Sequence, residues 1–224
     1  MFAFLNTLAK GGVVMIPLGI CSLAALTVLI ERIVILRRSS AESGTLMASI
    51  RACVAKGDLP GALEKAQASS GPVASVLAHG LRATLMGLNP QQAMDEEGLA
   101  QLPILQRRLV VLDTVVAIAP LLGLLGTVIG MIASFHILAI AGTENPGGIT
   151  AGIAEALITT ATGLIIAIFA LVGFNWCQEK VRSIGTDMER RAVQLASWLV
   201  QIEKKDQAEI EKENEAKVAS YQAL

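Results

Sequence analysis

The sequence predicts an all-α membrane protein with three transmembrane helices and long cytoplasmic helical extensions. Of its 224 residues, 53% are hydrophobic and 17% charged, whereas soluble domains carry about 25% charged residues. The mean hydropathy is +0.59. Charge is absent from residues 11–30, 114–143 and 156–178. Each run is long enough for a helix to cross a hydrocarbon core of roughly 30 Å, and no segment has the alternation of a strand.

The N-terminal segment and the first transmembrane helix, about 12–35, occupy residues 1–38. This apolar run is too long for a signal-peptide core and no A-x-A cleavage site follows it, so we expect it to be retained. Residues 39–108 are interpreted as a cytoplasmic helical loop. A turn is expected at 57–60, and helices are expected to open at Gly71-Pro72 and Asn89-Pro90.

Residues 109–178 hold the second and third transmembrane helices, about 112–140 and 151–177, joined by a short periplasmic loop, 142–150. Residues 179–224 are predicted to form a cytoplasmic C-terminal helix and a charged tail. Six apolar residues there recur at helical spacing: Val181, Ile184, Met188, Leu195, Leu199 and Ile202. One stripe of this kind predicts that the third helix continues beyond the membrane.

Basic residues predict the orientation. Of 18 Lys and Arg, only Lys10 precedes the first span and none lies between the second and third. The other 17 fall in 32–108 or after Cys177. By the positive-inside rule both of those regions are cytoplasmic, so the N-terminus and the 142–150 loop lie outside. The charge pairs Glu31-Arg32 and Arg107-Arg108 would anchor the inner ends of helices one and two.

Polar side chains follow one face of each of the last two spans. In the second, four residues are seven apart: Asp113, Pro120, Thr127 and Ser134. Beside them lie Gly123, Gly126 and Gly130, of which the last two form a small-residue packing motif. In the third, Glu155, Thr159 and Thr162 share a face, with Thr160 and Gly163 nearby. Because polar groups in a bilayer face a partner or water, these stripes suggest a polar lumen between helices or subunits.

Simpler interpretations stay open. Glu155 fits an interfacial carboxylate near a helix N-terminus. The hydroxyls fit bonds to their own helix carbonyls or across a packed interface. Asp113 fits a charge at the inner boundary, His136 an interfacial residue, and His79 an ordinary histidine of a water-exposed domain.

Other classes of protein have little support. Cys21, Cys53 and Cys177 stand far apart without a CxxC or a neighbouring His, so neither a disulfide framework nor a metal site is predicted. A net charge of −1 gives no attraction for nucleic acid. No nucleophile–base pair or phosphate loop indicates an enzyme, and no cofactor is expected.

Two strings carry a resemblance to a known family. Ala119-Pro120-Leu121-Leu122-Gly123-Leu124-Leu125-Gly126-Thr127-Val128, followed by Gly130-Met131-Ile132 and Phe135, resembles the second-helix motif of the MotA/TolQ/ExbB proton-channel family. Gly152-Ile153-Ala154-Glu155-Ala156-Leu157, with Thr159-Thr160-Ala161-Thr162-Gly163-Leu164, Ala167-Ile168 and Asn175, resembles its third-helix motif. The Gly57-Asp58 turn is a weaker match.

The resemblance is closest to ExbB and TolQ, because the MotA branch has a longer chain and an additional span. The string from Pro120 to Met131 favours ExbB, with TolQ next. One position departs from the family pattern: Phe169 stands where the third helix usually has proline. Losing that proline removes a source of kinking, so this helix is expected to be straighter.

The resemblance implies an inner-membrane stator subunit. Similar proteins form a homopentamer around the single spans of two ExbD- or TolR-like partner chains, surrounded by membrane lipid. Protons pass between ring and partner and drive work on TonB- or TolA-like proteins. Carried over by position, Thr127 and Thr160 match pore-lining threonines and Glu155 the third-helix glutamate, while the proton-binding aspartate belongs to the partner.

Three alternatives stay open beside an ExbB-like role. They are a TolQ-like subunit of the Tol-Pal system, a structural membrane scaffold without ion flux, and a small-molecule carrier. Carriers usually show internal repeats and broken helices, and neither is found here. The absence of further carboxylates in the spans favours protons over sodium as the ion.

Overall fold

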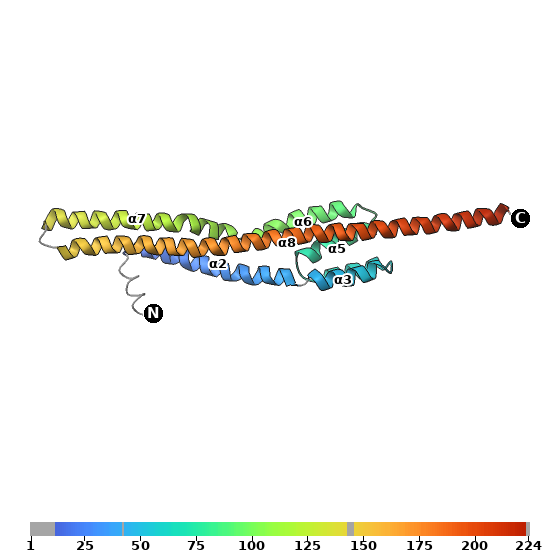
Figure 1. Cartoon of the computed structure of the whole chain (residues 1–224), viewed down its shortest axis with the longest axis horizontal. Coiled ribbons are helices and arrows are strands. Elements are labelled where there is room, and N and C mark those ends of the chain that lie inside the picture. Colours follow the sequence, from blue (N-terminus) through green and yellow to red (C-terminus); the bar gives the residue numbers. More distant parts are fainter. Residues whose placement is uncertain (1–11, 42, 143–145, 223–224) are drawn as a thin grey trace. The chain divides into compact units, whose positions relative to one another are not determined.

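A computed structural model describes residues 12–41, 43–142 and 146–222, and within these ranges the chain consists of helices joined by short turns (Figure 1). No strand occurs in the described ranges, so the predicted all-α class is confirmed. The helices are α2 (Met15–Ala41), α3 (Ser43–Val54), α4 (Leu59–Ala68), α5 (Pro72–Leu85), α6 (Pro90–Gln106), α7 (Leu109–Ala141) and α8 (Pro146–Gln222).

Three segments are long and apolar enough to cross a membrane, judged by length and composition: Met15–Val54, Leu109–Ile140 and Pro146–Ile202. Each of them overlaps one of the three uncharged runs of the sequence, and the third contains all of residues 156–178. The 33 residues of α7 extend about 50 Å at 1.5 Å per residue, so this helix is longer than a hydrocarbon core of roughly 30 Å.

The chain divides into two compact units. The first comprises Met1–Val34 and Gln106–Glu179, and the second comprises Ile35–Leu105 and Lys180–Leu224. The first unit contains the long apolar runs of α2, α7 and α8. In it α7 lies beside the N-terminal part of α8 (Figure 1).

The helices of the second unit begin where the sequence carries caps and prolines. The Asp58 carboxylate accepts a hydrogen bond from the Gly61 N–H at 2.9 Å and so caps α4. Gly71, with φ of +125°, precedes Pro72 at the start of α5. The Asn89 side chain accepts from the Gln91 N–H at 3.0 Å where α6 begins. Proline suits these first turns because its missing N–H would have no partner there.

The predicted apolar stripe on the C-terminal part of α8 is buried in the second unit. Five stripe residues are buried: Val181, Ile184, Met188, Leu195 and Leu199. Leu77 and Leu81 of α5 and Met94 of α6 are fully buried in the same unit. Arg51 of α3 lies over the Trp198 ring, 5.6 Å from its centroid. The second unit therefore has a hydrophobic core of its own.

Two breaks differ in detail from what the sequence suggests. α8 begins at Pro146, inside the segment expected to be a loop, because proline fits a first helical turn. Between α6 and α7 the backbone breaks at Arg108, a non-glycine residue with φ of +63°. The guanidinium of Arg108 pairs with the Glu31 carboxylate of α2, which also lies 3.5 Å from Arg32.

Candidate functional site

The contact between α7 and α8 is made through glycines. A Cβ on Gly163 would lie 2.5 Å from the Ala119 carbonyl oxygen, and one on Gly130 would lie 2.8 Å from that of Gly152. A Cβ on Gly123 would lie 3.1 Å from the Thr160 Cα. Because these neighbours are backbone atoms, the helices approach as closely as small-residue contacts in membranes allow.

Two hydroxyls bridge the same contact. The Thr160 hydroxyl donates to the Gly123 carbonyl at 2.9 Å. The Ser134 hydroxyl, which is buried, lies 3.1 Å from the Ile149 carbonyl of α8 and 3.0 Å from the Gly130 carbonyl of its own helix. Each of these two hydroxyls therefore joins one helix to the other, as polar side chains do between packed membrane helices.

The remaining threonines bond within their own helices. The Thr159 hydroxyl donates to the Glu155 carbonyl at 2.7 Å, and its side chain is fully buried against Gly126. Thr162 donates to the Ile158 carbonyl at 2.8 Å. Thr127 donates to the Leu124 carbonyl at 2.6 Å and is half-buried. Thr127 and Thr160 thus keep partly open side chains, whereas Thr159 and Ser134 are enclosed.

Glu155 lies against the start of α2. Its carboxylate occupies the space next to Gly12, where an added Cβ would overlap the Oε1 atom. It is nine residues beyond Pro146, the first residue of α8. The dipole effect falls off within the first turn, so the helix end beside this carboxylate belongs to α2 rather than to α8.

The glycine contacts and hydrogen bonds described above do not involve three further predicted residues. Asp113 and His136 are exposed on α7. Pro120 is half-buried inside α7, which continues through it to Ala141. Residues 12–41, 43–142 and 146–222 contain no group of three or more His, Cys, Asp or Glu side chains able to hold a metal ion.

An apolar cavity of about 820 Å³ lies between α2 and α8 in the first unit. Leu18 and Leu26 line it from α2, and Ile158, Thr162 and Phe169 line it from α8. α8 runs without interruption through Phe169, whose side chain is 72% exposed. The residue that replaces the family's usual proline therefore contributes an aromatic ring to the wall of this cavity.

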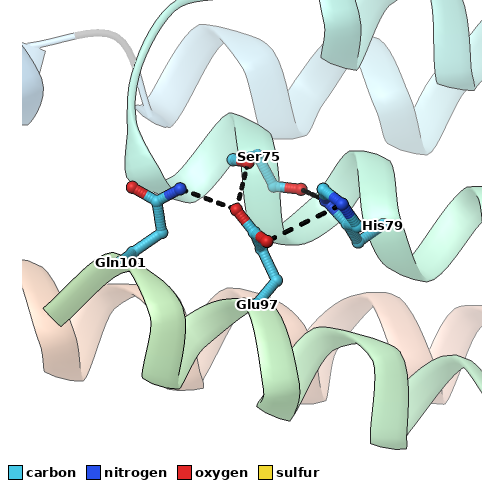
Figure 2. Close-up of polar contacts among 4 residues, drawn as sticks. All are labelled: Ser75, His79, Glu97 and Gln101. Carbon is cyan, nitrogen blue, oxygen red and sulfur yellow. Dashed lines mark hydrogen bonds and ion pairs between the residues drawn. The ribbon is translucent and has the colours of Figure 1, made fainter. Parts of the chain in front are cut away.

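A polar cluster that sequence reasoning missed links α5 to α6 in the second unit (Figure 2). Glu97 Oε1 accepts hydrogen bonds from the Ser75 hydroxyl at 2.5 Å and from Gln101 Nε2 at 2.6 Å. His79 Nε2 lies 3.7 Å from Glu97 Oε2, and His79 Nδ1 lies 2.9 Å from the Ser75 carbonyl. Both pairs, Ser75 with His79 and Glu97 with Gln101, are four apart, a spacing that places each pair on one helix face.

This environment changes the acidity of Glu97. Burial by itself would raise the pKa of the carboxyl, but the hydrogen bonds from Ser75 and Gln101 and the charge of His79 outweigh it, so the pKa lies below its usual range. His79 is thus part of a defined polar contact rather than an isolated surface histidine.

Comparison with known proteins agrees with this architecture. The sequence pattern of the MotA/TolQ/ExbB proton channel family matches residues 68–190. "Putative biopolymer transport protein ExbB-like 3" of Synechocystis is 33% identical over 171 residues, 74% of this chain and 80% of that protein. "Putative biopolymer transport protein ExbB-like 1" of the same organism is 38% identical over 181 residues, 76% and 69% of the two chains. "Tol-Pal system protein TolQ" of Haemophilus influenzae is 40% identical over 83 residues, 37% and 36% of the two.

The chain belongs to the MotA/TolQ/ExbB proton channel family. The three candidate spans and the family together indicate an inner membrane protein. The resemblance drawn from the second- and third-helix strings is confirmed.

Proposed function

We propose that this chain is an ExbB-like stator subunit of the inner membrane that conducts protons together with an ExbD-like single-span partner and energises TonB-dependent transport across the outer membrane. Support comes from the family and from relatives named as ExbB-like biopolymer transport proteins, which align with about three quarters of the chain. A TolQ-like role in the Tol-Pal system is the second candidate, and the relative named TolQ aligns with 37% of the chain.

The observation that carries the proposal is the arrangement of hydroxyls on α7 and α8. Thr127 and Thr160, which match the family's pore-lining threonines, are partly open beside a glycine contact, whereas Ser134 and Thr159 are enclosed by it. We assign Thr127 and Thr160 to the wall of the ion path and Ser134, Thr159 and the glycines to helix packing. A hydroxyl suits such a wall because it hydrogen-bonds without carrying charge and so orients water without trapping an ion.

Glu155 adds negative charge near this wall and tunes the entry of cations. The proposed orientation places the N-terminus and residues 142–150, which include the start of α8, in the periplasm. It places residues 39–108 and the part of α8 beyond residue 178 in the cytoplasm. Five copies of this chain would surround the spans of two partner chains. Such a ring offers equivalent binding positions for a carboxylate on the partner. Several proton-transfer steps are needed to do work, because one proton yields only about 2.3 kcal/mol per 100 mV of membrane potential.

Native mass spectrometry of the tagged chain, purified gently from its own membranes, tests the assembly. Five copies with two copies of a small single-span protein are the expected result, and the identity of that protein separates an ExbB-like from a TolQ-like role. A monomer, or a complex with an unrelated protein, would contradict the proposal.

Thr127→Val tests the ion path, with Thr27→Val on α2 as the matched control. Both hydroxyls bond only to carbonyls of their own helix among the described contacts, so neither substitution removes a bond between helices. We expect Thr127→Val to reduce proton flux through liposomes that hold the purified complex, and Thr27→Val to leave it unchanged. Equal flux in both variants, with the assembly intact, would favour the structural scaffold.

A further inference from the structure

The Glu155 carboxylate occupies a space that exists because residue 12 is glycine. An ideal Cβ on Gly12 would overlap Glu155 Oε1 and lie 2.7 Å from its Cδ. The backbone at Gly12 has φ of +69°, a conformation that residues with a side chain rarely adopt. Steric room and backbone geometry therefore both select glycine at this position.

The neighbouring backbone is the first turn of α2. The Met15 N–H donates to the Gly12 carbonyl at 3.2 Å, and the Ile16 N–H donates to the Val13 carbonyl at 3.2 Å. A helix start concentrates partial positive charge from amides that have no partner within the helix. A carboxylate is favoured beside such a helix start, and the glycine at position 12 leaves room for the side chain of Glu155.

We propose that Gly12 is a positioning residue for Glu155 and that α2 thereby controls where this carboxylate lies along the ion path. The inference rests on the proposed function, because it concerns the part that Glu155 takes in ion entry. Any side chain at position 12 displaces the carboxylate from the start of α2 while its charge is retained. In this role Gly12 acts through Glu155, the side chain next to it.

Gly12→Ala tests this, with Gly142→Ala as the matched control. Gly142 also has a positive φ, +59°, but an added Cβ would meet nothing within 4 Å. The control thus carries backbone strain without a collision. Flux of protons is measured across a range of pH in liposomes that hold the tagged complex. Since misplacing a group by about 1 Å can cost on the order of a hundredfold, we expect Gly12→Ala to lose about tenfold or more. The pH profile should shift toward that of Glu155→Gln, and Gly142→Ala should keep both the flux and the profile of the wild type.

Two double variants separate positioning from a general loss of structure. Glu155→Asp shortens the side chain by one methylene, so Gly12→Ala with Glu155→Asp should recover flux relative to Gly12→Ala alone. In a Glu155→Ala background no carboxylate meets the added methyl. There Gly12→Ala should lower the melting temperature of the complex only as much as Gly142→Ala does in the wild type.

The outcomes are distinct. If Gly12→Ala and Gly142→Ala have the same proton flux, pH profile and melting temperature, the positioning role is refuted and the proposed function is unaffected. A wild-type complex without proton flux overturns the proposed function and the role of Gly12 in it. If Gly12→Ala fails to assemble, restored assembly and flux in the Glu155→Asp double variant support the inference, and their absence refutes it.

Discussion

Replacing Gly163 by alanine should separate α7 from α8. The added Cβ would lie 2.5 Å from the Ala119 carbonyl oxygen and 3.1 Å from the Gly123 Cα. Both neighbours are backbone atoms, so no side-chain rotation relieves the collision. Ordinary contact begins at 3.4 Å, so the helices must move apart by about 0.9 Å at this point.

The cost has two parts. Forcing a methyl group into a packed contact costs about 1–3 kcal/mol. The Thr160 hydrogen bond to the Gly123 carbonyl, now 2.9 Å, would lengthen beyond bonding distance. An interhelical hydrogen bond in a membrane contributes about 0.6 kcal/mol on average. The free energy of unfolding should therefore fall by about 2–4 kcal/mol.

The change in the free energy of unfolding is measured by unfolding the protein in mixed micelles of increasing SDS fraction. Labelling of the Cys177 thiol, which is fully buried in the fold, reports the unfolded fraction. Gly19→Ala is the control, because a Cβ there would meet nothing within 4 Å. It should change the free energy of unfolding by no more than about 0.5 kcal/mol. Since Gly163→Ala already breaks the Thr160 bond, Thr160→Val should cost less in that background than in the wild type. Equal stability of the two glycine variants, or an unchanged cost of Thr160→Val, would refute the reasoning.

Two more predictions concern the second unit. Because the pKa of Glu97 lies below its ordinary range in the fold, the carboxylate stabilises the protein at neutral pH, and this stability is lost as the pH falls through that lowered pKa. In a plot of melting temperature against pH, Glu97→Gln should reduce the fall in melting temperature at acid pH. Glu96→Gln, at the exposed neighbouring position, should leave that fall unchanged. The same acid dependence in both variants would count against a stabilising role for the cluster in Figure 2. Asp58→Ala removes the side-chain cap of α4 and should cost about 1 kcal/mol in chemical denaturation. Asp58→Asn keeps an acceptor and should cost less, and an equal loss in both would show that the cap is not the cause.

The all-α class could be predicted because its signals are local. An uncharged run long enough for a bilayer is visible in the sequence without any knowledge of partners. The helix starts at Pro72 and Pro90 could also be predicted from the sequence, since proline after glycine or asparagine indicates the first turn of a helix. The start of α8 at Pro146 was not anticipated, because the neighbouring glycines suggest a loop.

Which hydroxyls are enclosed could not be predicted, because it depends on how two helices meet. Thr159 and Thr160 are adjacent in the sequence, yet Thr159 is fully buried against Gly126 whereas Thr160 stays partly open. The approach of Glu155 to Gly12 joins segments far apart in the chain and leaves no periodic signal. The polar cluster around Glu97 was missed for the same reason, since only its halves, each four residues apart, are visible on single helices.

The hydrogen bonds of the Thr127 and Thr160 hydroxyls determine which protonation state of a partner's carboxyl group the proposed path would favour. A hydroxyl has one donor and two acceptor lone pairs. Both donors are used, by the Leu124 and Gly123 carbonyls, so each oxygen can only accept a further hydrogen bond. Water or a protonated carboxyl group can donate to such an oxygen, whereas an ionised carboxylate cannot. A wall of this kind therefore favours the proton-loaded form of a partner's acid.

Serine and valine at position 127 should therefore have different effects on proton flux. Thr127→Ser keeps the oxygen and its helix bond, so the complex should retain proton flux. Thr127→Val keeps the shape and removes the acceptor, so flux should fall. Equal flux in the two variants would show that the oxygen contributes nothing to the path, and the open side of Thr127 would then be a packing surface for a neighbouring helix.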